Sequence, residues 1–317
     1  LEISTYEGQN LILTKEHPLL TLENNKLIWK KAYTLKENDL LINITQLPEV
    51  KKITESSRIA RILGFTLADG TIFVKKGIYK DGKGYLYNGT KKRLRITNAS
   101  ENVLEQAKRD IETEFDVPAR IYKRKYCNAY NLENSNSKLV DKIIKLGVPI
   151  GKKSHKIRVP KIVFESSNIF KANFISALIS CDGYVDKKGY HVIYCSKSLN
   201  FLKDLNLLLL HFGIQSTIRK KLAKNNGKIY LNYILNITDH QSLENLKKIG
   251  IIDSEKNYKL NKHKFHSFKR RKFGNYPAKD IYATKIISIV QKEGIKQVYH
   301  LSVPKKHSFL ANGIISH

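Results

Sequence analysis

The stretch ILGFTLADGTIF (62–73) is an apolar run that ends in an Asp-Gly pair, and ISALISCDGYVD (175–186) has the same form. Each run also carries small residues one and five positions before its aspartate, which suits two helices that pack closely. Glycine after an apolar helix favours a left-handed cap, so each aspartate should fall in the last helical turn. The small residues are Gly64, Ala68, Ala177 and Cys181, the aspartates are Asp69 and Asp182, and the caps are expected at Gly70 and Gly183.

The match between the two runs continues along the chain as an internal repeat. Segments 100–125 and 196–221 each combine an amphipathic helix pattern with a basic strand pattern. Lys153 and Lys256 each lie six residues after a glycine in the segments that follow. The repeat predicts two copies of one unit, each with the order helix, two strands, helix, two strands, helix. The first copy carries an additional Gly-rich hairpin at 75–92.

The charge balance of the chain favours a polyanionic partner. Its 317 residues carry 57 Lys and Arg against 28 Asp and Glu, a formal net charge of +29. Nucleic acid explains this excess better than a membrane does, because the chain has no long apolar segment and no signal-peptide pattern. We therefore expect a soluble protein that acts in the cytoplasm. The three cysteines lack metal-ligand spacing, which argues against a zinc site or a disulfide framework.

The two Asp-Gly ends suggest a metal site. A carboxylate in the last turn of a helix meets the negative end of the helix dipole and is disfavoured there unless a cation is present. If the two helices lie side by side, Asp69 and Asp182 meet and can hold divalent metal. Such an arrangement is typical of two-metal phosphoryl transfer. The alternative is that each Asp-Gly pair only ends a helix.

The two runs resemble the paired signature helices of the LAGLIDADG homing endonucleases, in the single-chain form with two repeats. The resemblance covers roughly residues 55–262, although Leu67 and Ser180 stand where the family pattern has its first Asp. It implies a domain at 51–261 of two αββαββα repeats, approximately 55–154 and 168–261, related by a pseudo-twofold axis. Members of this family bind a long DNA duplex in a saddle of antiparallel strands and cut both strands with divalent metal.

The same resemblance implies the roles of four site residues. Asp69 and Asp182 match the metal ligands, with two or more Mg²⁺ ions bridged between them, and Lys153 and Lys256 match the active-site lysines. A lysine beside a scissile phosphate positions water or stabilises developing charge. Because most lysines of so basic a chain are solvated surface charges, a surface role for these two stays open. Their neighbours Lys152 and Lys156 are the next candidates.

Three basic strand patterns indicate DNA contact. RLRIT (93–97), RIYKRKY (120–126) and TIRKKLAK (217–224) alternate charged with apolar residues, so that one face packs on helices and the other meets phosphates. A solvated sheet face is the alternative. The basic segment 262–280 is either a linker or a DNA-binding arm. The candidate DNA-binding residues are Arg93, Arg95, Arg120, Lys123, Arg124, Lys125, Arg219, Lys220, Lys221, Lys269, Arg270 and Arg271.

The ends of the chain belong to another architecture. Residues 10–42 and 285–317 predict short strands separated by turns, without helical periodicity. The simplest interpretation is one β module, formed by residues 1–50 and 281–317, that is interrupted by an inserted domain. The whole chain is then an α+β protein.

The terminal segments resemble inteins, the protein-splicing family with an all-β Hint horseshoe. TKEH (14–17) is similar to the Thr-x-x-His block, and the segment 298–317 is similar to the two C-terminal blocks. The resemblance implies that Thr14 and His17 polarise the N-terminal splice junction and protonate its leaving amine. It implies that His307 and His317 assist cyclisation of a terminal asparagine.

Three departures from the intein pattern bear on splicing. The block with the N-terminal Cys or Ser nucleophile does not precede Leu1, and the family's terminal Asn does not follow His317. His300 also stands where the family usually has Asp. We therefore expect the polypeptide as written to be unable to splice, because the reaction needs that nucleophile. An intact precursor would supply the missing residues.

Together these patterns predict a monomeric intein that carries a site-specific double-strand DNA endonuclease. Its partners are the intein-free DNA of the host gene and the flanking host-protein segments in cis. Three alternatives stay open: a splicing module whose endonuclease has decayed to a DNA-binding protein, a maturase-like RNA-binding protein, and a free-standing homing endonuclease.

Overall fold

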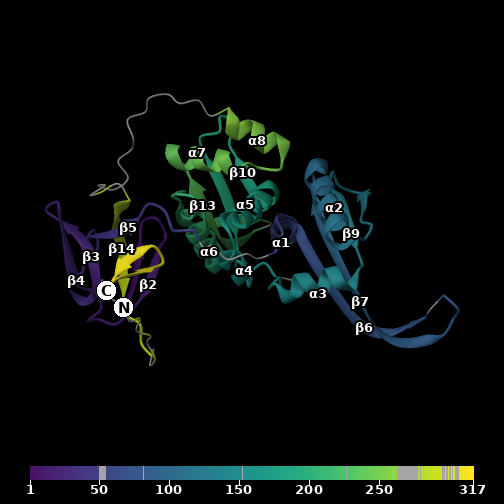
Figure 1. Ribbon diagram of the computed structural model, residues 1–317, viewed down its shortest axis with the longest axis horizontal. Helices are drawn as coiled ribbons and strands as arrows, with labels where there is room; N and C mark the ends of the chain where they lie inside the picture. The colour runs from purple at the N-terminus through teal and green to yellow at the C-terminus, as the bar shows by residue number, and fades with distance from the viewer. Residues whose placement is uncertain are drawn as a thin grey trace. The chain divides into compact units, whose positions relative to one another are not determined.

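The computed structural model describes residues 1–49, 55–80, 82–151, 153–225, 227–262, 278, 280–294, 297, 299, 301, 303 and 307–317 (Figure 1). The chain divides into two compact units. Unit 1 combines Leu1–Pro48, Leu202–Asn245 and Lys264–His317, and unit 2 combines Glu49–Phe201 and Leu246–His263. The structure does not describe five residues to which the sequence drew attention, which are Lys152, Lys269, Arg270, Arg271 and His300. Within the described ranges, no helix has both the length and the apolar character that crossing a membrane requires.

Unit 1 contains an eight-stranded antiparallel sheet built from both ends of the chain. The strand order is β15-β16-β3-β5-β14-β1-β2, and β4 pairs with β3 outside this path. Strand β14, from the C-terminal part, lies between β5 and β1 from the N-terminal part. The strands are β1 (Glu2–Thr5), β2 (Asn10–Ile12), β3 (Pro18–Glu23), β4 (Lys26–Lys31), β5 (Leu40–Ile44), β14 (Ile281–Val290), β15 (Phe309–Ala311) and β16 (Ile314–Ser316).

The core of this sheet is formed by apolar side chains that alternate along the strands. One cluster joins Ile3, Leu19, Leu41, Ile286 and Ile314, all fully buried, so both chain ends contribute to one core. Burial of such side chains from water is the main source of the sheet's stability.

A tight turn places the last strand of unit 1. Asn312 and Gly313 both have positive φ angles, of 51° and 89°. Two central residues with positive φ give the hairpin turn whose twist matches that of the flanking strands, and an Asn-Gly pair suits it. The turn folds β16 back along β15, where it also pairs with β3 and β5.

The segment Leu202–Asn245 packs with the β sheet of unit 1. Helix α6 (Leu199–Leu210) crosses one border of this segment and α7 (His240–Ile249) crosses the other, with the antiparallel hairpin of β12 (Thr217–Asn225) and β13 (Lys228–Ile237) between them. The Tyr282 hydroxyl on β14 donates to Oε1 of Gln215 at 2.8 Å and accepts from Nδ2 of Asn43 at 2.8 Å. The first of these hydrogen bonds, which is partly buried, connects the segment to the sheet.

Unit 2 begins with a helix, a long hairpin, a second helix and a second strand pair. Its sheet has the order β6-β7-β9-β8. The hairpin expected at 75–92 is the distal part of β6 and β7, which extend beyond the rest of this sheet (Figure 1). The elements are α1 (Ser57–Asp69), β6 (Gly70–Lys80), β7 (Leu86–Asn98), α2 (Glu101–Phe115), β8 (Arg120–Lys123), β9 (Tyr130–Asn134) and α3 (Ser137–Lys145).

A second run of elements starts with α4 (Lys161–Glu165) and α5 (Asn168–Asp182). It continues through the hairpin of β10 (Gly183–Val185) and β11 (Val192–Ser196) to α6, β12, β13 and α7, and ends with α8 (Ser254–Asn261). In chain order, a helix, two strands, a helix, two strands and a helix therefore occur twice, as the repeat predicted. The fold is a mixture of helices and antiparallel sheets.

Helices α1 and α5 pack directly on each other. A Cβ atom at Gly64 would lie 2.7 Å from the Cβ of Ala177 and 2.8 Å from the carbonyl oxygen of Phe174. Only glycine permits this approach, as the small-residue pattern predicted. The Arg61 guanidinium bridges α1 to its neighbours by pairing with Asp110 on α2 and donating to Asn173 on α5.

The expected left-handed caps at Gly70 and Gly183 are wrong. Gly70 has φ −90° and Gly183 has φ −73°, both in the extended region, because β6 and β10 begin there without a turn. The glycines are needed for space instead. A Cβ at Gly70 would lie 2.7 Å from the carbonyl oxygen of Thr66, and one at Gly183 would lie 2.5 Å from that of Ile179.

Candidate functional site

The carboxylates of Asp69 and Asp182 come together at the C-terminal ends of α1 and α5. Each is held by a neutral donor. Nδ2 of Asn98 donates to Oδ2 of Asp69 at 2.5 Å, and the Tyr194 hydroxyl donates to Oδ2 of Asp182 at 3.2 Å. Asn98 ends β7, which pairs with the strand that follows α1, and Tyr194 lies on β11, which pairs with the strand that follows α5. In each case this paired strand supplies the side chain that orients the aspartate.

The surroundings of the pair disfavour two negative charges. Burial raises the pKa of Asp69, against the lowering effect of hydrogen bonds from Asn98 and Cys181. Burial, reinforced by the charge of Asp69, raises the pKa of Asp182 to about 6, although solvent still reaches its side chain. A cation that binds between two such carboxylates stabilises their charged forms, because it offsets their mutual repulsion.

Lys153 and Lys256 lie at the same helix ends. Nζ of Lys153 donates to the carbonyl oxygens of Thr66 and Gly70 at the end of α1. Nζ of Lys256 donates to those of Ser180 at 2.6 Å and Cys181 at 2.9 Å at the end of α5. Each ammonium thus binds backbone carbonyls at a helix end, and it offsets the negative end of the dipole.

Burial also changes the protonation of Lys153. It lowers the pKa of this ammonium to about 8, against the opposing effect of the charges on Asp182 and Asp69. The side chain of Lys156, by contrast, is exposed. The structure therefore places Lys153, rather than Lys156, beside the carboxylates.

The donor set of this site fits a magnesium ion. Mg²⁺ is usually held by one or two carboxylates together with substrate phosphates and water. Two carboxylates with raised pKa values supply that minimum. No group of three or more His, Cys, Asp or Glu residues suited to a metal occurs among the residues that the structure describes. Water and a phosphodiester backbone can supply further oxygen ligands for such an ion.

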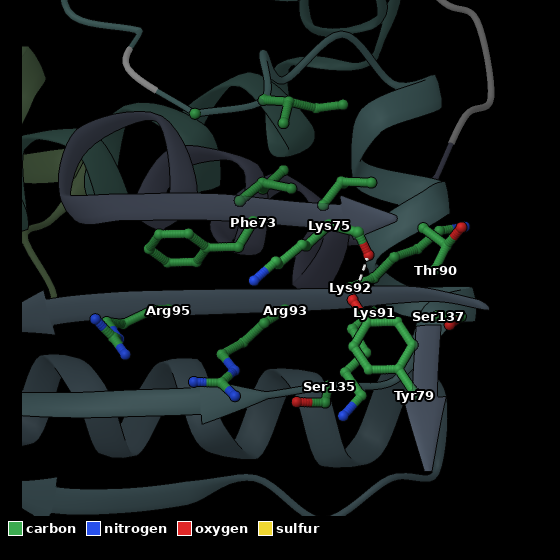
Figure 2. A pocket seen from close by; sticks show the side chains of 14 residues that line it. Phe73, Lys75, Tyr79, Thr90, Lys91, Lys92, Arg93, Arg95, Ser135 and Ser137 are labelled. Carbon is green, nitrogen blue, oxygen red and sulfur yellow. Dashed lines mark hydrogen bonds between the residues drawn. The ribbon is translucent and has the colours of Figure 1, made fainter. Parts of the chain in front are cut away.

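One face of the first sheet of unit 2 is basic and aromatic (Figure 2). Phe73 pairs with Arg93 across the β6–β7 hairpin, and the residues two positions away on each strand share their face. The opposite face carries fully buried Leu94 and Ile96. The exposed face is hollowed into a groove of about 820 Å³. Its lining includes, from this face, Phe73, Lys75, Tyr79, Lys91, Arg93 and Arg95, together with Lys92 from the opposite face and with Ser135 and Ser137.

The arginines of this groove are held in fixed directions. Arg95 pairs with Glu133 on β9, and its guanidinium lies 5.3 Å from the ring centroid of Phe73. Arg93 lies 3.5 Å from the same carboxylate. Although partial burial opposes it, hydrogen bonding from Tyr122 and Arg95 lowers the pKa of Glu133, so this partner stays charged. Arginines fixed in this way are suited to phosphate or base contacts.

The other described DNA-binding candidates occupy three places. Arg120 pairs opposite Glu133 and extends the basic face, while Lys123 ends the same strand on the alternate face. Arg124 and Lys125 lie in the turn between β8 and β9. On β12 in unit 1 the strand parity places Arg219 and Lys221 on one face and Lys220 on the other. All three β12 side chains are exposed.

The histidines predicted for splicing gather in unit 1. The rings of His307 and His317 lie 6.1 Å apart between centroids, and Trp29 on β4 meets His317 edge-on at 5.5 Å. The backbone N–H of His317 donates to the carbonyl oxygen of Pro18, next to His17, at 3.2 Å. Thr14 is exposed, and its carbonyl oxygen accepts from the N–H of His17 at 3.3 Å. The cluster thus joins both ends of the chain.

Sequence reasoning did not point to Asn98, Tyr194 or Trp29, which contact these sites. Asn98 and Tyr194 end up beside the carboxylates through strand pairing, and Trp29 reaches His317 across the sheet. The only sequence signal for Asn98 and Tyr194 is that each lies in the second strand after an Asp-Gly pair. For Trp29, the single tryptophan of the chain, no motif marks the position.

Comparison with protein families gives a match along the whole chain. A family model described as the intein splicing domain matches residues 1–317. Among curated relatives, a replication factor C small subunit from Methanocaldococcus jannaschii is 32% identical over 267 residues, covering 82% of this chain and 13% of that protein. A probable translation initiation factor IF-2 from the same organism is 31% identical over 210 residues, covering 65% and 18%.

A ribonucleoside-diphosphate reductase NrdEB subunit alpha from Bacillus subtilis is 24% identical and covers 99% of this chain and 30% of that protein. The chain therefore spans less than a third of the length of these relatives. Among solved structures, mesophilic variants of the homing endonuclease I-DmoI align with a TM-score of 0.44 at 22% identity, covering 61% of this chain and 94% of theirs. I-DmoI in complex with DNA and Mn aligns at 0.41, with 23% identity, covering 57% and 89%.

Proposed function

Because the chain belongs to the intein family, whose splicing-domain model spans residues 1–317, we propose that it is a self-splicing module that also carries a site-specific DNA endonuclease. Proteins with unrelated names each contain a stretch similar to this chain that makes up less than a third of their length, which suits an element inserted into different host proteins. The observation that carries the endonuclease is the pair Asp69 and Asp182, held together at two packed helix ends with a lysine at each.

The proposed reaction is hydrolysis of a phosphodiester bond in each strand of a DNA duplex. Asp69 and Asp182 would hold Mg²⁺, as two or more ions bridged by the two carboxylates. Such ions, when bound, activate water and stabilise charge on the phosphoryl oxygens. Asn98 and Tyr194 keep the carboxylates aimed at the site. Lys153 and Lys256 place positive charge where the scissile phosphates would lie, and they would stabilise the charge that develops there.

The basic faces supply most of the affinity for DNA in this proposal. Arg93, Arg95 and Arg120 lie on one face of the first sheet, and Arg219 and Lys221 share a face on β12. Neutralisation of phosphates by such residues releases counterions, so binding should weaken steeply with salt. In this proposal both faces contact DNA, within a DNA-binding domain at 51–261 and beside an arm at 262–280.

The proposed splicing module has the Hint horseshoe form and comprises residues 1–50 and 281–317. Thr14 and His17 would act at the N-terminal junction, by polarising the peptide bond and protonating the leaving amine. His307 and His317, whose rings are neighbours, would assist cyclisation at the C-terminal junction. Imidazole suits these steps because its pKa lies near neutral pH. The partners are the flanking host segments in cis and the intein-free host DNA, in the cytoplasm.

The endonuclease is tested with a plasmid in which the coding sequences that flank this chain in its gene have been joined. Purified protein with Mg²⁺ should cut this plasmid once. Asp69→Asn and Asp182→Asn should bind it with unchanged affinity and leave it intact, while Glu37→Gln, an exposed carboxylate in unit 1, should cut normally. Binding without cutting by the unmodified protein would identify a decayed endonuclease, and preference for RNA would favour a maturase-like protein.

Splicing is tested in a precursor that contains the natural flanks on both sides. The unmodified precursor should release the ligated flanks, while His317→Ala should accumulate a branched or cleaved intermediate with an intact C-terminal junction. Unchanged ligation by His317→Ala would remove this residue from the reaction.

A further inference from the structure

A hydrogen bond joins the two splicing segments at a residue to which the resemblance gives no role in splicing. Nε2 of His17 and Oγ of Ser316 lie 2.8 Å apart. Ser316 is the last residue of β16 and is fully buried. Water therefore competes little with its hydroxyl for the hydrogen bond to His17. Its sequence position, directly before His317, gives it no chemical role of its own in the splicing reactions described above.

The backbone holds this contact in place from both sides. Ser316 pairs with Leu19 on β3 and with Phe309 on β15. Its neighbour His317 donates its N–H to the carbonyl oxygen of Pro18, the residue after His17, at 3.2 Å. Two adjacent residues at the end of β16 are thus bound to two adjacent residues at the start of β3, once through side chains and once through the backbone.

A hydroxyl at this position serves both protonation states of the imidazole. It accepts from Nε2–H when the neutral ring carries its proton on Nε2, and it accepts from the same N–H when the ring is protonated on both nitrogens. The contact between Nε2 and Oγ is the same in both states, and the heavy atoms stay in place. A proton can therefore be taken up and released at Nδ1 without a change in ring orientation, which general acid–base catalysis requires.

We propose that Ser316 is a positioning residue for His17 that links the N-terminal splice junction to the C-terminal segment. The proposal rests on the proposed splicing function. It means that His17 is oriented for its proton transfer only when β16 is docked on β3. Activation of the N-terminal junction thus depends on assembly of the segment that ends in His317.

The kinetic test uses the precursor with natural flanks and measures cleavage of the N-terminal junction by an added thiol, and separately cleavage of the C-terminal junction. Ser316→Ala should slow N-terminal cleavage at least tenfold, and Ser316→Thr, which keeps the hydroxyl, should recover most of the rate. In a His17→Ala background, Ser316→Ala should have no further effect. Ser288→Ala, which removes a hydroxyl from β14 of the same sheet, is the matched control.

Two kinetic results would overturn the proposal. One is equal slowing of both junctions by Ser316→Ala, which indicates a general loss of structure. The other is a full additional loss from Ser316→Ala in the His17→Ala background, which indicates that the two residues act independently.

A second measurement separates failure of this proposal from failure of the splicing function. The sample is the polypeptide of residues 1–317 without flanking segments, and the ring ¹⁵N signals of its His17 are recorded by NMR with and without Ser316→Ala. A shift of the His17 signals with unchanged His307 signals supports the proposal even if the unmodified precursor does not splice. Unchanged His17 signals overturn it whether or not splicing occurs.

Discussion

The carboxylates of Asp69 and Asp182 repel each other at the paired ends of α1 and α5, and this repulsion adds to burial in raising the pKa of Asp182 to about 6. An unfolded chain would titrate this group near 3.8. The folded protein therefore binds more protons than the unfolded one between about pH 4 and pH 6. The consequence is that stability and activity should depend on pH in opposite directions.

We expect the raised pKa of Asp182 to increase the Tm of the metal-free protein, measured in a chelator, as pH falls from 7 toward 4.5. This increase should be lost as pH rises through 6. Cleavage of target DNA should decrease below pH 6, because the protonated carboxyl does not bind Mg²⁺, and added Mg²⁺ should restore part of the rate. Asp182→Asn should lack this contribution to the Tm. An identical dependence of the Tm on pH in both proteins would contradict the shifted pKa.

Replacing Lys153 by Met should leave DNA binding nearly intact and slow cleavage by about 10² or more, because an ammonium that stabilises developing charge acts mainly in the transition state. The control is Lys156→Met, which removes an exposed charge three residues away. Single-turnover cleavage at saturating protein measures the chemical step. Equal losses in the two variants would mean that only overall charge matters.

Gly64→Ala should destabilise unit 2, because the added methyl would lie 2.7 Å from the Cβ of Ala177 and 2.8 Å from a backbone oxygen. Overpacking of this kind costs about 1–3 kcal/mol. The matched control is Gly82→Ala, where a Cβ has no atom within 4 Å. Thermal or urea unfolding compares the two variants, and a change of similar size in both would show that α1 and α5 tolerate separation.

Tyr282→Phe should destabilise unit 1 by about 1–3 kcal/mol, because it removes the hydrogen bonds of the hydroxyl to Oε1 of Gln215 and from Nδ2 of the buried Asn43. Tyr33→Phe, at a ring that is 53% exposed, should have little effect. Hydrogen exchange in both β14 and the segment Leu202–Asn245 should accelerate in Tyr282→Phe. Acceleration in β14 alone would show that the segment does not depend on this network.

The repeat and its helix ends were predictable from the sequence because they depend on local patterns. Small residues at the positions of Gly64 and Ala177 predicted close helix packing, and the structure confirms it. The caps at Gly70 and Gly183 were predicted wrongly, because glycine is also required where a strand begins directly against the preceding helical turn.

Contacts that depend on strand pairing were not predictable from one sequence. Asn98, Tyr194 and Ser316 reach their partners only through the register of β7, β11 and β16. A shift of one residue in any of these strands would turn the side chain to the opposite face. The packing of Leu202–Asn245 with the terminal β strands likewise rests on contacts between residues far apart in the chain, such as Gln215 and Tyr282.

The position of β14 between β5 and β1 also sets the timing of folding during synthesis. The ribosome makes β1 and β5 first, and the strand that fills the space between them follows more than two hundred residues later. Until then both strands present unpaired edges, which are prone to pair wrongly with other chains. The strands of the first sheet of unit 2 all end by residue 134, so this sheet can form before β14 is synthesised and pairs with the edges of β1 and β5. Mistimed release of the nascent chain should therefore harm the terminal sheet before it harms the first half of the insert.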